Sequence, residues 1–203
     1  MVNVILAIDD EDTILGEFYT ECLNDLENFE NDRCAITSLR SRRLNDLAIS
    51  VSVPRDSKFV FMAYSHGSDS ELLVGGMRPY ISETSDLTLF KGSFFYTCSC
   101  NTGKRLGHSL INHECISYIG YKEKFEIWDF NRAPFVECAN YGYKLFVQGE
   151  NVQTILEQMK GKYDEKIDNY TNDYFGAVHL LANRNALLGL GDLTYSIDSI
   201  LNT

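Results

Sequence analysis

Short apolar runs recur along this chain, and segments with helical spacing follow most of them. A continuous apolar run of this kind, bounded by turn residues, is typical of a strand that is buried on both faces. Buried strands that alternate with helices form a mostly parallel sheet, and the helices then cover both of its faces. This alternation therefore predicts an α/β fold with three layers, and it constrains the chain more than any other feature of the sequence.

The predicted elements follow from the spacing of apolar residues. The predicted strands are Val2–Ile8, Cys34–Leu39, Lys58–Tyr64, Ser93–Cys98, Cys115–Tyr121 and Phe175–Leu181, with a small hairpin of Glu71–Val74 and Pro79–Ser82 closed by Gly75-Gly76. The predicted helices are Thr13–Leu26, Arg42–Ile49, Lys104–Glu114, Ala133–Val147 and Val152–Tyr170. No repeat or Gly/Ser/Pro-rich linker interrupts the pattern, which favours one domain over residues 1–203.

The composition and the N-terminal residues indicate in which cellular compartment the protein is expected. The chain is 44% hydrophobic and 23% charged, as in soluble globular proteins. No apolar run approaches the roughly 20 residues that cross a bilayer. Met1–Ile8 lacks the basic region of a signal peptide, and the acidic run Asp9–Asp12 follows it at once. We therefore expect a cytoplasmic protein without a membrane partner.

The charge bears on nucleic-acid binding. The formal net charge is −11, so phosphate groups are repelled by the chain as a whole. One short basic stretch, Arg40–Arg43, stands out, and we expect it to form a solvated loop or helix face. Direct binding of nucleic acid is therefore not expected.

The spacing of cysteine and histidine residues indicates whether disulfides or a metal site are expected. The six cysteines are Cys22, Cys34, Cys98, Cys100, Cys115 and Cys138. In a cytoplasmic chain with a full core, we expect most of them to be reduced core residues. The sequence has no C-x-x-C motif, and His108 and His113 do not have the spacing that places two ligands on one helix face. Neither a metal nor a cofactor is expected.

Two residues with catalytic potential directly follow predicted strands. His66 follows Lys58–Tyr64, and Cys100 follows Ser93–Cys98. Ligands bind at the carboxyl ends of the strands in such sheets, and a cysteine nucleophile needs a neighbouring group that handles protons. The backbone N–H groups of Gly67 and Cys100 are candidates for an oxyanion hole. The pattern predicts a Cys-His dyad, and His108, His113 and His179 are expected to take no part in the chemistry.

The residues around both positions resemble a known family. Phe59–Gly67, with the sequence FVFMAYSHG, resembles the His-Gly strand end of the caspase-like (clan CD) cysteine peptidases. Gly92–Tyr121 resembles the nucleophile strand and following helix of the CHAT branch of these peptidases. Later helices and the closing segment of that branch are similar to Phe135–Gly149, Val152–Met159 and His179–Asp192. The resemblance spans residues 58–192 and implies a three-layer caspase-like fold with a mostly parallel central sheet.

The resemblance also implies an activity. Cys100 carries over as the nucleophile, His66 as the catalytic histidine and Gly67 as an oxyanion contributor. The implied reaction is endopeptidase cleavage of a protein substrate through an acyl-enzyme, without cofactor or metal. Regulation by a partner protein or by self-cleavage is expected, and the branch makes a role in bacterial (antiviral) defence or programmed death plausible.

This sequence departs from its relatives in two places. The caspase pattern Q-A-C-[RQG]-G is absent. No acidic residue directly precedes Cys100, as one does in the Arg/Lys-specific metacaspases. The side-chain specificity of cleavage is therefore left open.

The choice of Cys100 over Cys98 follows from position along the strand. Cys98 continues the apolar run, where burial raises the thiol pKa and leaves it inert. Cys100 comes at the end of the run, and Asn101 or Thr102 is predicted to cap a helix beginning at Lys104. The positive end of that helix dipole would favour a thiolate.

Two other functions compete with the peptidase. One is a catalytically silent caspase-like interaction module, because a fold does not fix an activity. The other is a receiver-like signalling domain, since Val4–Leu15 (VILAIDDEDTIL) resembles the start of a receiver with its paired acids. A receiver also needs an aspartate after its third strand, where this chain has Tyr64-Ser65-His66. The acids instead suit a loop before a helix, where they interact favourably with the helix dipole.

Overall fold

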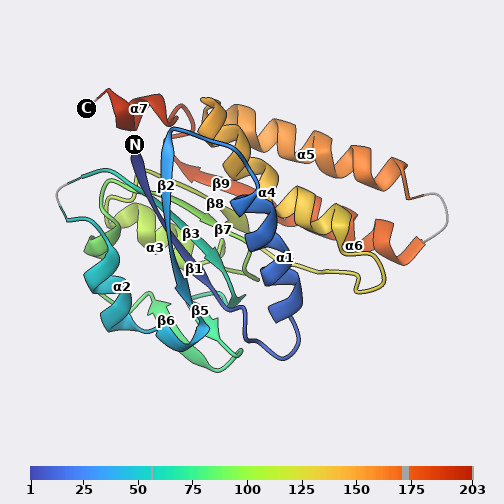
Figure 1. The fold of residues 1–203 in the computed structure, drawn as a ribbon, viewed down its shortest axis with the longest axis horizontal. Helices are drawn as coiled ribbons and strands as arrows, with labels where there is room; N and C mark the ends of the chain where they lie inside the picture. Colours follow the sequence, from blue (N-terminus) through green and yellow to red (C-terminus); the bar gives the residue numbers. More distant parts are fainter. Residues whose placement is uncertain (56, 171–173, 203) are drawn as a thin grey trace.

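The central sheet is mostly parallel, as predicted. The structure is a computed structural model that describes residues 1–55, 57–170 and 174–202. Within these residues six strands form one sheet in the order β2-β1-β3-β7-β8-β9 (Figure 1). All neighbouring strands from β2 to β8 are parallel, and β9 is antiparallel to β8. The strands are β1 (Val2–Ile8), β2 (Cys34–Arg40), β3 (Val60–Tyr64), β7 (Phe94–Thr97), β8 (Ser117–Tyr121) and β9 (Leu187–Gly191).

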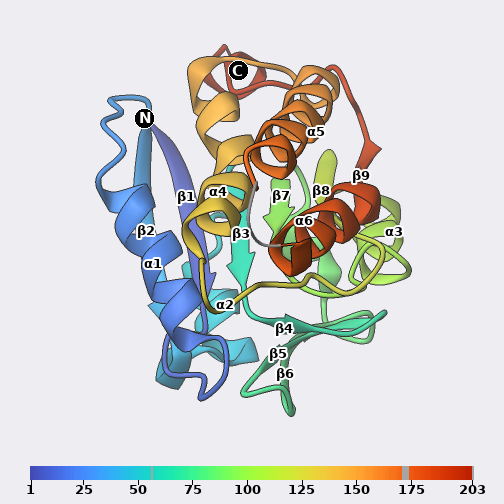
Figure 2. The same ribbon diagram turned by 90° about the vertical axis from the view of Figure 1, so that its right-hand side faces the viewer.

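A second, smaller sheet lies beyond the carboxyl ends of the central strands (Figure 2). It contains β4 (His66–Gly67), β5 (Glu71–Val74) and β6 (Arg78–Ser82) in an antiparallel arrangement. Gly75 and Gly76 form the β5–β6 turn, and both have positive φ angles, 60° and 67°. Glycine is the residue that adopts this conformation without strain, so the predicted Gly-Gly hairpin is confirmed.

Helices cover both faces of the central sheet (Figure 2). One buried cluster joins the sheet to α1, α4 and α5, and a second joins its other face to α2, α3 and the small sheet. The helices are α1 (Gly16–Glu27), α2 (Asp46–Ser52), α3 (Leu106–Asn112), α4 (Ala133–Gln148), α5 (Val152–Asp168), α6 (Tyr174–Ala186) and α7 (Asp198–Leu201), with short 3₁₀ turns η1 (Ser41–Arg43) and η2 (Leu87–Phe90). The arrangement is a three-layer α/β fold.

Burial on both faces explains the continuous apolar runs. In β1, Leu6 and Ile8 belong to the first cluster, whereas Ile5 and Ala7 belong to the second. Successive side chains of a strand point to opposite faces, so a strand covered on both sides needs apolar residues at nearly every position.

The predicted strand at Phe175–Leu181 is wrong, because α6 occupies this segment and the last strand, β9, follows it. Periodicity does not separate a short apolar run in a strand from one in a helix. The buried residues Gly176, Leu180 and Asn183 recur at helical spacing. They give α6 one inward face, whereas Phe175 and Leu181 are exposed.

Two helices begin later than predicted because side chains bind the backbone ahead of them. Asp12 Oδ1 accepts hydrogen bonds from the Ile14 and Leu15 N–H groups, at 2.9 and 2.7 Å, and α1 begins only at Gly16. Asn45 accepts the Ala48 N–H and caps α2 at its beginning. Such side-chain contacts compete with helical hydrogen bonds and fix the boundary.

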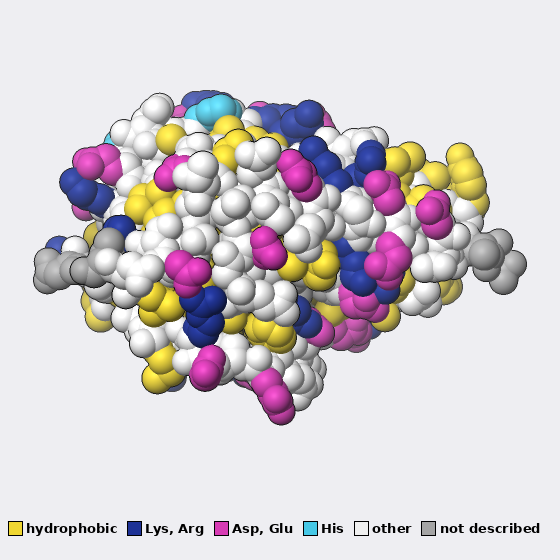
Figure 3. Space-filling model, turned by 90° about the horizontal axis from the view of Figure 1, so that it is seen from above, with side chains coloured by type: hydrophobic (Ala, Val, Ile, Leu, Met, Phe, Trp, Pro, Cys, Tyr) yellow, Lys and Arg dark blue, Asp and Glu magenta, His cyan; other side chains and the backbone are white. Residues whose placement is uncertain are grey.

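The surface seen in Figure 3 carries acidic and basic side chains interspersed with one another. The net charge of −11 is therefore not gathered into one acidic patch on this face. None of the helices in the described ranges combines the length and apolarity that a bilayer-spanning segment requires.

Candidate active site

The structure places His66 and Cys100 beyond the carboxyl ends of neighbouring strands. β3 pairs with β7 in parallel, and Ala63 lies opposite Thr97 at the last paired position. His66 begins β4 just past β3, and Cys100 lies in the turn that follows β7. The two residues selected from the sequence therefore project from the same edge of the sheet.

Gly67 packs directly against the backbone of the Cys100 turn. A Cβ atom at Gly67 would lie 2.6 Å from the Cys100 carbonyl oxygen and 2.9 Å from the Ser99 Cβ and Thr102 Cγ2 atoms. Any other residue would force these atoms apart, so glycine is required for close approach here. The predicted oxyanion contributor thus touches the predicted nucleophile's own turn.

His66 has a carboxylate partner that was not predicted for it. Its Nε2 atom lies 3.1 Å from Asp12 Oδ2, and the side chains of His66 and Asp12 are 24% and 3% exposed. Burial of Asp12 opposes its ionisation, but the Leu15 and Ile14 amides and the His66 ring outweigh it, so its pKa lies below the ordinary value. Asp12 is therefore an ionised group that contacts the His66 ring at Nε2 and leaves Nδ1 outside this contact.

The β5–β6 turn lies beside the His66 ring. A Cβ atom at Gly76 would lie 3.6 to 3.9 Å from three atoms of the ring. The neighbouring Gly75 N–H donates to Asp9 Oδ2 at 2.7 Å, and Asp9 is buried. Asp9 thus holds the turn in place beside the imidazole.

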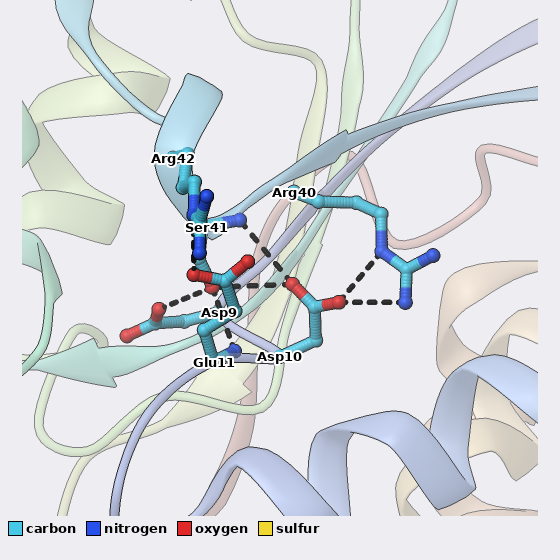
Figure 4. Close-up of polar contacts among 6 residues, drawn as sticks. All are labelled: Asp9, Asp10, Glu11, Arg40, Ser41 and Arg42. Carbon is cyan, nitrogen blue, oxygen red and sulfur yellow. Dashed lines mark hydrogen bonds and ion pairs between the residues drawn. The ribbon is translucent and has the colours of Figure 1, made fainter.

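Asp9 belongs to a polar network that links the ends of β1 and β2 (Figure 4). Its Oδ1 accepts from the Ser41 hydroxyl at 2.8 Å, and the same hydroxyl accepts the Glu11 N–H at 2.8 Å. Two ion pairs flank this contact, Arg40 with Asp10 at 2.6 Å and Arg42 with Glu11 at 2.9 Å. The basic stretch therefore pairs with the protein's own acids at a solvated surface, in line with the prediction.

The Cys100 sulfur is engaged by residues 122–131, the segment between β8 and α4. It accepts the Phe125 N–H at 3.3 Å, and the thiol lies 3.7 Å from the Phe125 carbonyl oxygen. Cys100 is partly buried. Within the described residues, no hydrogen bond joins this sulfur to the His66 ring.

The electrostatic environment of Cys100 differs from the prediction. Burial raises its thiol pKa, and the Phe125 amide and Lys124 only partly oppose this effect. The predicted helix cap is wrong, because α3 begins at Leu106 and no side chain caps it. Thr102 instead bonds Tyr118 at 2.8 Å. The positive end of the α3 dipole therefore lies beyond the turn that holds Cys100.

Cys98 has the buried position that its place in the strand predicts. It is 1% exposed, and its thiol lies 3.4 Å from the Ala139 carbonyl oxygen of α4. Burial raises its pKa far above the ordinary range. Cys98 is thus the less reactive thiol of the two.

Tyr19 of α1 is a buried core residue. Burial raises the pKa of its phenol, and the negative charges of Cys100, Tyr80, Asp12 and Asp9 add to this effect. The phenol of Tyr19 is therefore held in its neutral form.

The described residues contain no group of three or more His, Cys, Asp or Glu side chains arranged to hold a metal ion. All six cysteines lie in these residues and none forms a disulfide. Both oxygens of Asp9 are already hydrogen-bonded, to Ser41 and Gly75. The receiver alternative thus gains no support from the paired acids.

Two functional candidates, Asp12 and Phe125, were not assigned to the dyad from the sequence. Asp12 had a usable signal, because an acid in the loop after β1 lies near the end of β3 once those strands pair. Phe125 had none, since its role depends on a backbone N–H that any residue except proline provides.

A comparison with protein-family models finds no match, and a search among curated proteins finds no significant similarity.

Proposed function

We propose that this protein is a caspase-like cysteine endopeptidase in which Cys100 is the nucleophile and His66 handles the proton. The observation that carries the proposal is the position of these residues after the neighbouring parallel strands β3 and β7. The buried Asp12 carboxylate at the His66 ring adds to it. The sheet with helices on both faces agrees with the fold that the family resemblance implies.

The first half of the reaction forms an acyl-enzyme. His66 takes the proton of the Cys100 thiol, the resulting thiolate attacks the carbonyl carbon of the peptide bond, and the carbonyl oxygen takes up the negative charge. The N–H groups of Gly67 and Cys100 are the proposed donors to that oxygen. As the C–N bond breaks, His66 transfers its proton to the leaving amine.

The second half of the reaction hydrolyses the acyl-enzyme and releases the carboxylic acid product. Neutral His66 accepts a proton from a water molecule, whose oxygen attacks the thioester carbon. The C–S bond then breaks, the peptide leaves as a carboxylic acid, and Cys100 is regenerated. Asp12 stabilises the imidazolium whenever His66 is protonated. The substrate is a protein, and an activating partner or self-cleavage regulates the site, in defence or programmed death as the resemblance suggests.

A second candidate is a silent interaction module with the same fold. The raised pKa of Cys100 and the contact of its sulfur with Phe125 favour this reading. The first lowers the fraction of reactive thiolate and the second occupies the sulfur, so the dependence of cleavage on Cys100 has to be tested directly.

The test compares the two cysteines in peptide-library cleavage and in iodoacetamide labelling across pH, with mass-spectrometric assignment of labelled sites. Cys100→Ala is expected to abolish cleavage and to remove the most reactive of the six thiols. Cys98→Ala serves as the matched control and is expected to cost mainly stability. Cleavage that persists in Cys100→Ala, or that disappears in a folded Cys98→Ala protein, would contradict the assignment.

A further inference from the structure

Residues 122–131, named here the strap, run alongside the turn that holds Cys100. The Asn101 N–H donates to the Glu123 carbonyl at 3.0 Å, and the Phe125 N–H donates to the Cys100 sulfur at 3.3 Å. The strap therefore contacts the turn at Asn101 and at the sulfur itself. A reacting carbonyl carbon has to come within about 3–3.5 Å of that sulfur.

Helix α6 holds the strap through Glu126, the residue after Phe125. The Glu126 N–H donates to Asn183 Oδ1 at 2.7 Å, and Asn183 Nδ2 donates to the Glu126 carbonyl at 2.6 Å. The Glu126 carboxylate also contacts the Nδ1 atom of His179, one turn earlier on α6. Asn183 is fully buried, so breaking its two bonds would leave polar groups without partners.

Ring contacts hold other parts of the strap. The Trp128 ring lies 5.6 Å from the Phe175 ring and 5.7 Å from the His179 ring, both on α6. The Phe125 side chain is buried 4.8 Å from Tyr121 and 5.8 Å from Phe18. The strap is thus fixed at the core and along α6, and both sets of contacts keep Phe125 at the sulfur.

We propose that the strap is an autoinhibitory closure of the Cys100 site, and that the Asn183 and His179 contacts on α6 keep it closed. Release of Glu126 frees the Phe125 backbone from the sulfur and exposes the thiol to a carbonyl substrate. As a means of regulating cleavage, this closure rests on the proposed peptidase function. Its structural part, the access to Cys100, does not depend on peptidase activity.

The test measures how fast iodoacetamide labels each cysteine of the native full-length protein. Asn183→Ala removes both bonds to Glu126, and the Cys100 labelling rate is expected to rise roughly tenfold. Asn140→Ala is the matched control, because Asn140 is an equally buried asparagine on α4 that bonds Tyr64, Cys22 and Asp25 away from the strap. In that variant the Cys100 rate is expected to stay at the wild-type value.

Cys98 and Cys138 serve as internal reporters of global opening, since both are buried outside the strap. Their labelling is expected to stay slow in Asn183→Ala. Glu126→Gln gives a milder second variant that keeps the backbone bonds and removes the carboxylate from the His179 contact, and a rise of roughly twofold to fivefold is expected. An unchanged Cys100 rate in both variants, or a rise shared equally by all the buried cysteines, would overturn the strap proposal.

Library cleavage by the same variants separates this proposal from the proposed function. Faster labelling of Cys100 together with faster cleavage supports both. Faster labelling without any cleavage supports the strap and contradicts the peptidase. Cleavage that depends on Cys100 and is as fast in the wild type as in Asn183→Ala supports the peptidase and contradicts the strap.

Discussion

Asp12 serves the candidate site with each of its two carboxylate oxygens. Oδ1 accepts the Ile14 and Leu15 N–H groups, and Oδ2 lies at the His66 ring. Asp12→Asn keeps the first role, because asparagine binds such amides as well as aspartate does, and removes the charge that stabilises the imidazolium. Cleavage is expected to fall roughly 10–100-fold, as for loss of a hydrogen bond to a charged group.

The measurement is kcat/KM on a cleaved peptide, with circular dichroism to check the fold. Asp10→Asn is the control, since its carboxylate pairs with Arg40 and Ser41 instead of with His66. Activity in Asp12→Asn equal to that of Asp10→Asn would show that the carboxylate has no catalytic role.

His66 is the proposed proton-transfer residue, and its replacement tests that role. His66→Ala is expected to lower cleavage by roughly 10²–10⁴-fold, the usual effect of a general acid or base. The fold is expected to survive, because the side chain lies at the end of a strand and is partly exposed. Single His108→Ala and His113→Ala proteins are expected to keep wild-type rates, and a folded His66→Ala protein with an unchanged rate would remove His66 from the mechanism.

At the scale of elements, the contact between β4 and the turn after β7 determines the geometry of the site. Gly67→Ala places a methyl group 2.6 Å from the Cys100 carbonyl oxygen, so the turn has to move. We expect cleavage to be lost and the free energy of unfolding to fall by about 1–3 kcal/mol, as for other overpacked positions. Gly161→Ala in α5 is the control, because a Cβ atom there meets nothing within 4 Å and alanine favours the helix. Urea denaturation of both variants measures the two changes in the free energy of unfolding. An equal change in Gly67→Ala and Gly161→Ala would show that crowding at Gly67 does not destabilise the fold.

The apolar pattern of the sequence predicted most of the strands and helices but not all of them. Every predicted strand before residue 122 is present, and for β1, β3, β7 and β8 the signal was the apolar run that burial on both faces demands. The segment Phe175–Leu181 failed because its apolar residues fit either a strand or a helix, and only packing of α6 against its neighbours decided the matter. The cap predicted at Asn101 or Thr102 failed because Thr102 is hydrogen-bonded within the core to Tyr118.

At the scale of the whole molecule, the interior holds many groups that lose a proton at high pH. Five cysteines are buried, and burial raises the pKa of Cys115 to about 11 and of Cys138 to about 12. Thiols of the unfolded chain have a pKa of about 8.5. Above that pH the unfolded state therefore binds fewer protons than the folded state. The contribution of the buried thiols to the free energy of unfolding is fully present below that pH, and it is lost as the pH rises toward the pKa values of the folded protein.

By pH 10 each buried thiol is expected to lower the free energy of unfolding by up to about 2 kcal/mol. Urea denaturation at pH 8 and pH 10 measures this loss. A Cys138→Ala protein is the control and is expected to show a smaller difference between the two pH values. Equal denaturation midpoints at both pH values in the wild type would contradict the expectation.

The sequence by itself determined the α/β class, the mostly parallel sheet, and the two residues that follow β3 and β7. These features are local, because burial on both faces and the end of an apolar run are visible along the chain. The tertiary structure decided what surrounds those residues. The Asp12 carboxylate at His66, the Phe125 amide at Cys100 and the Asn183 contacts with Glu126 join segments that are far apart in sequence. Their positions follow from strand pairing and helix packing, so no local pattern could have specified them.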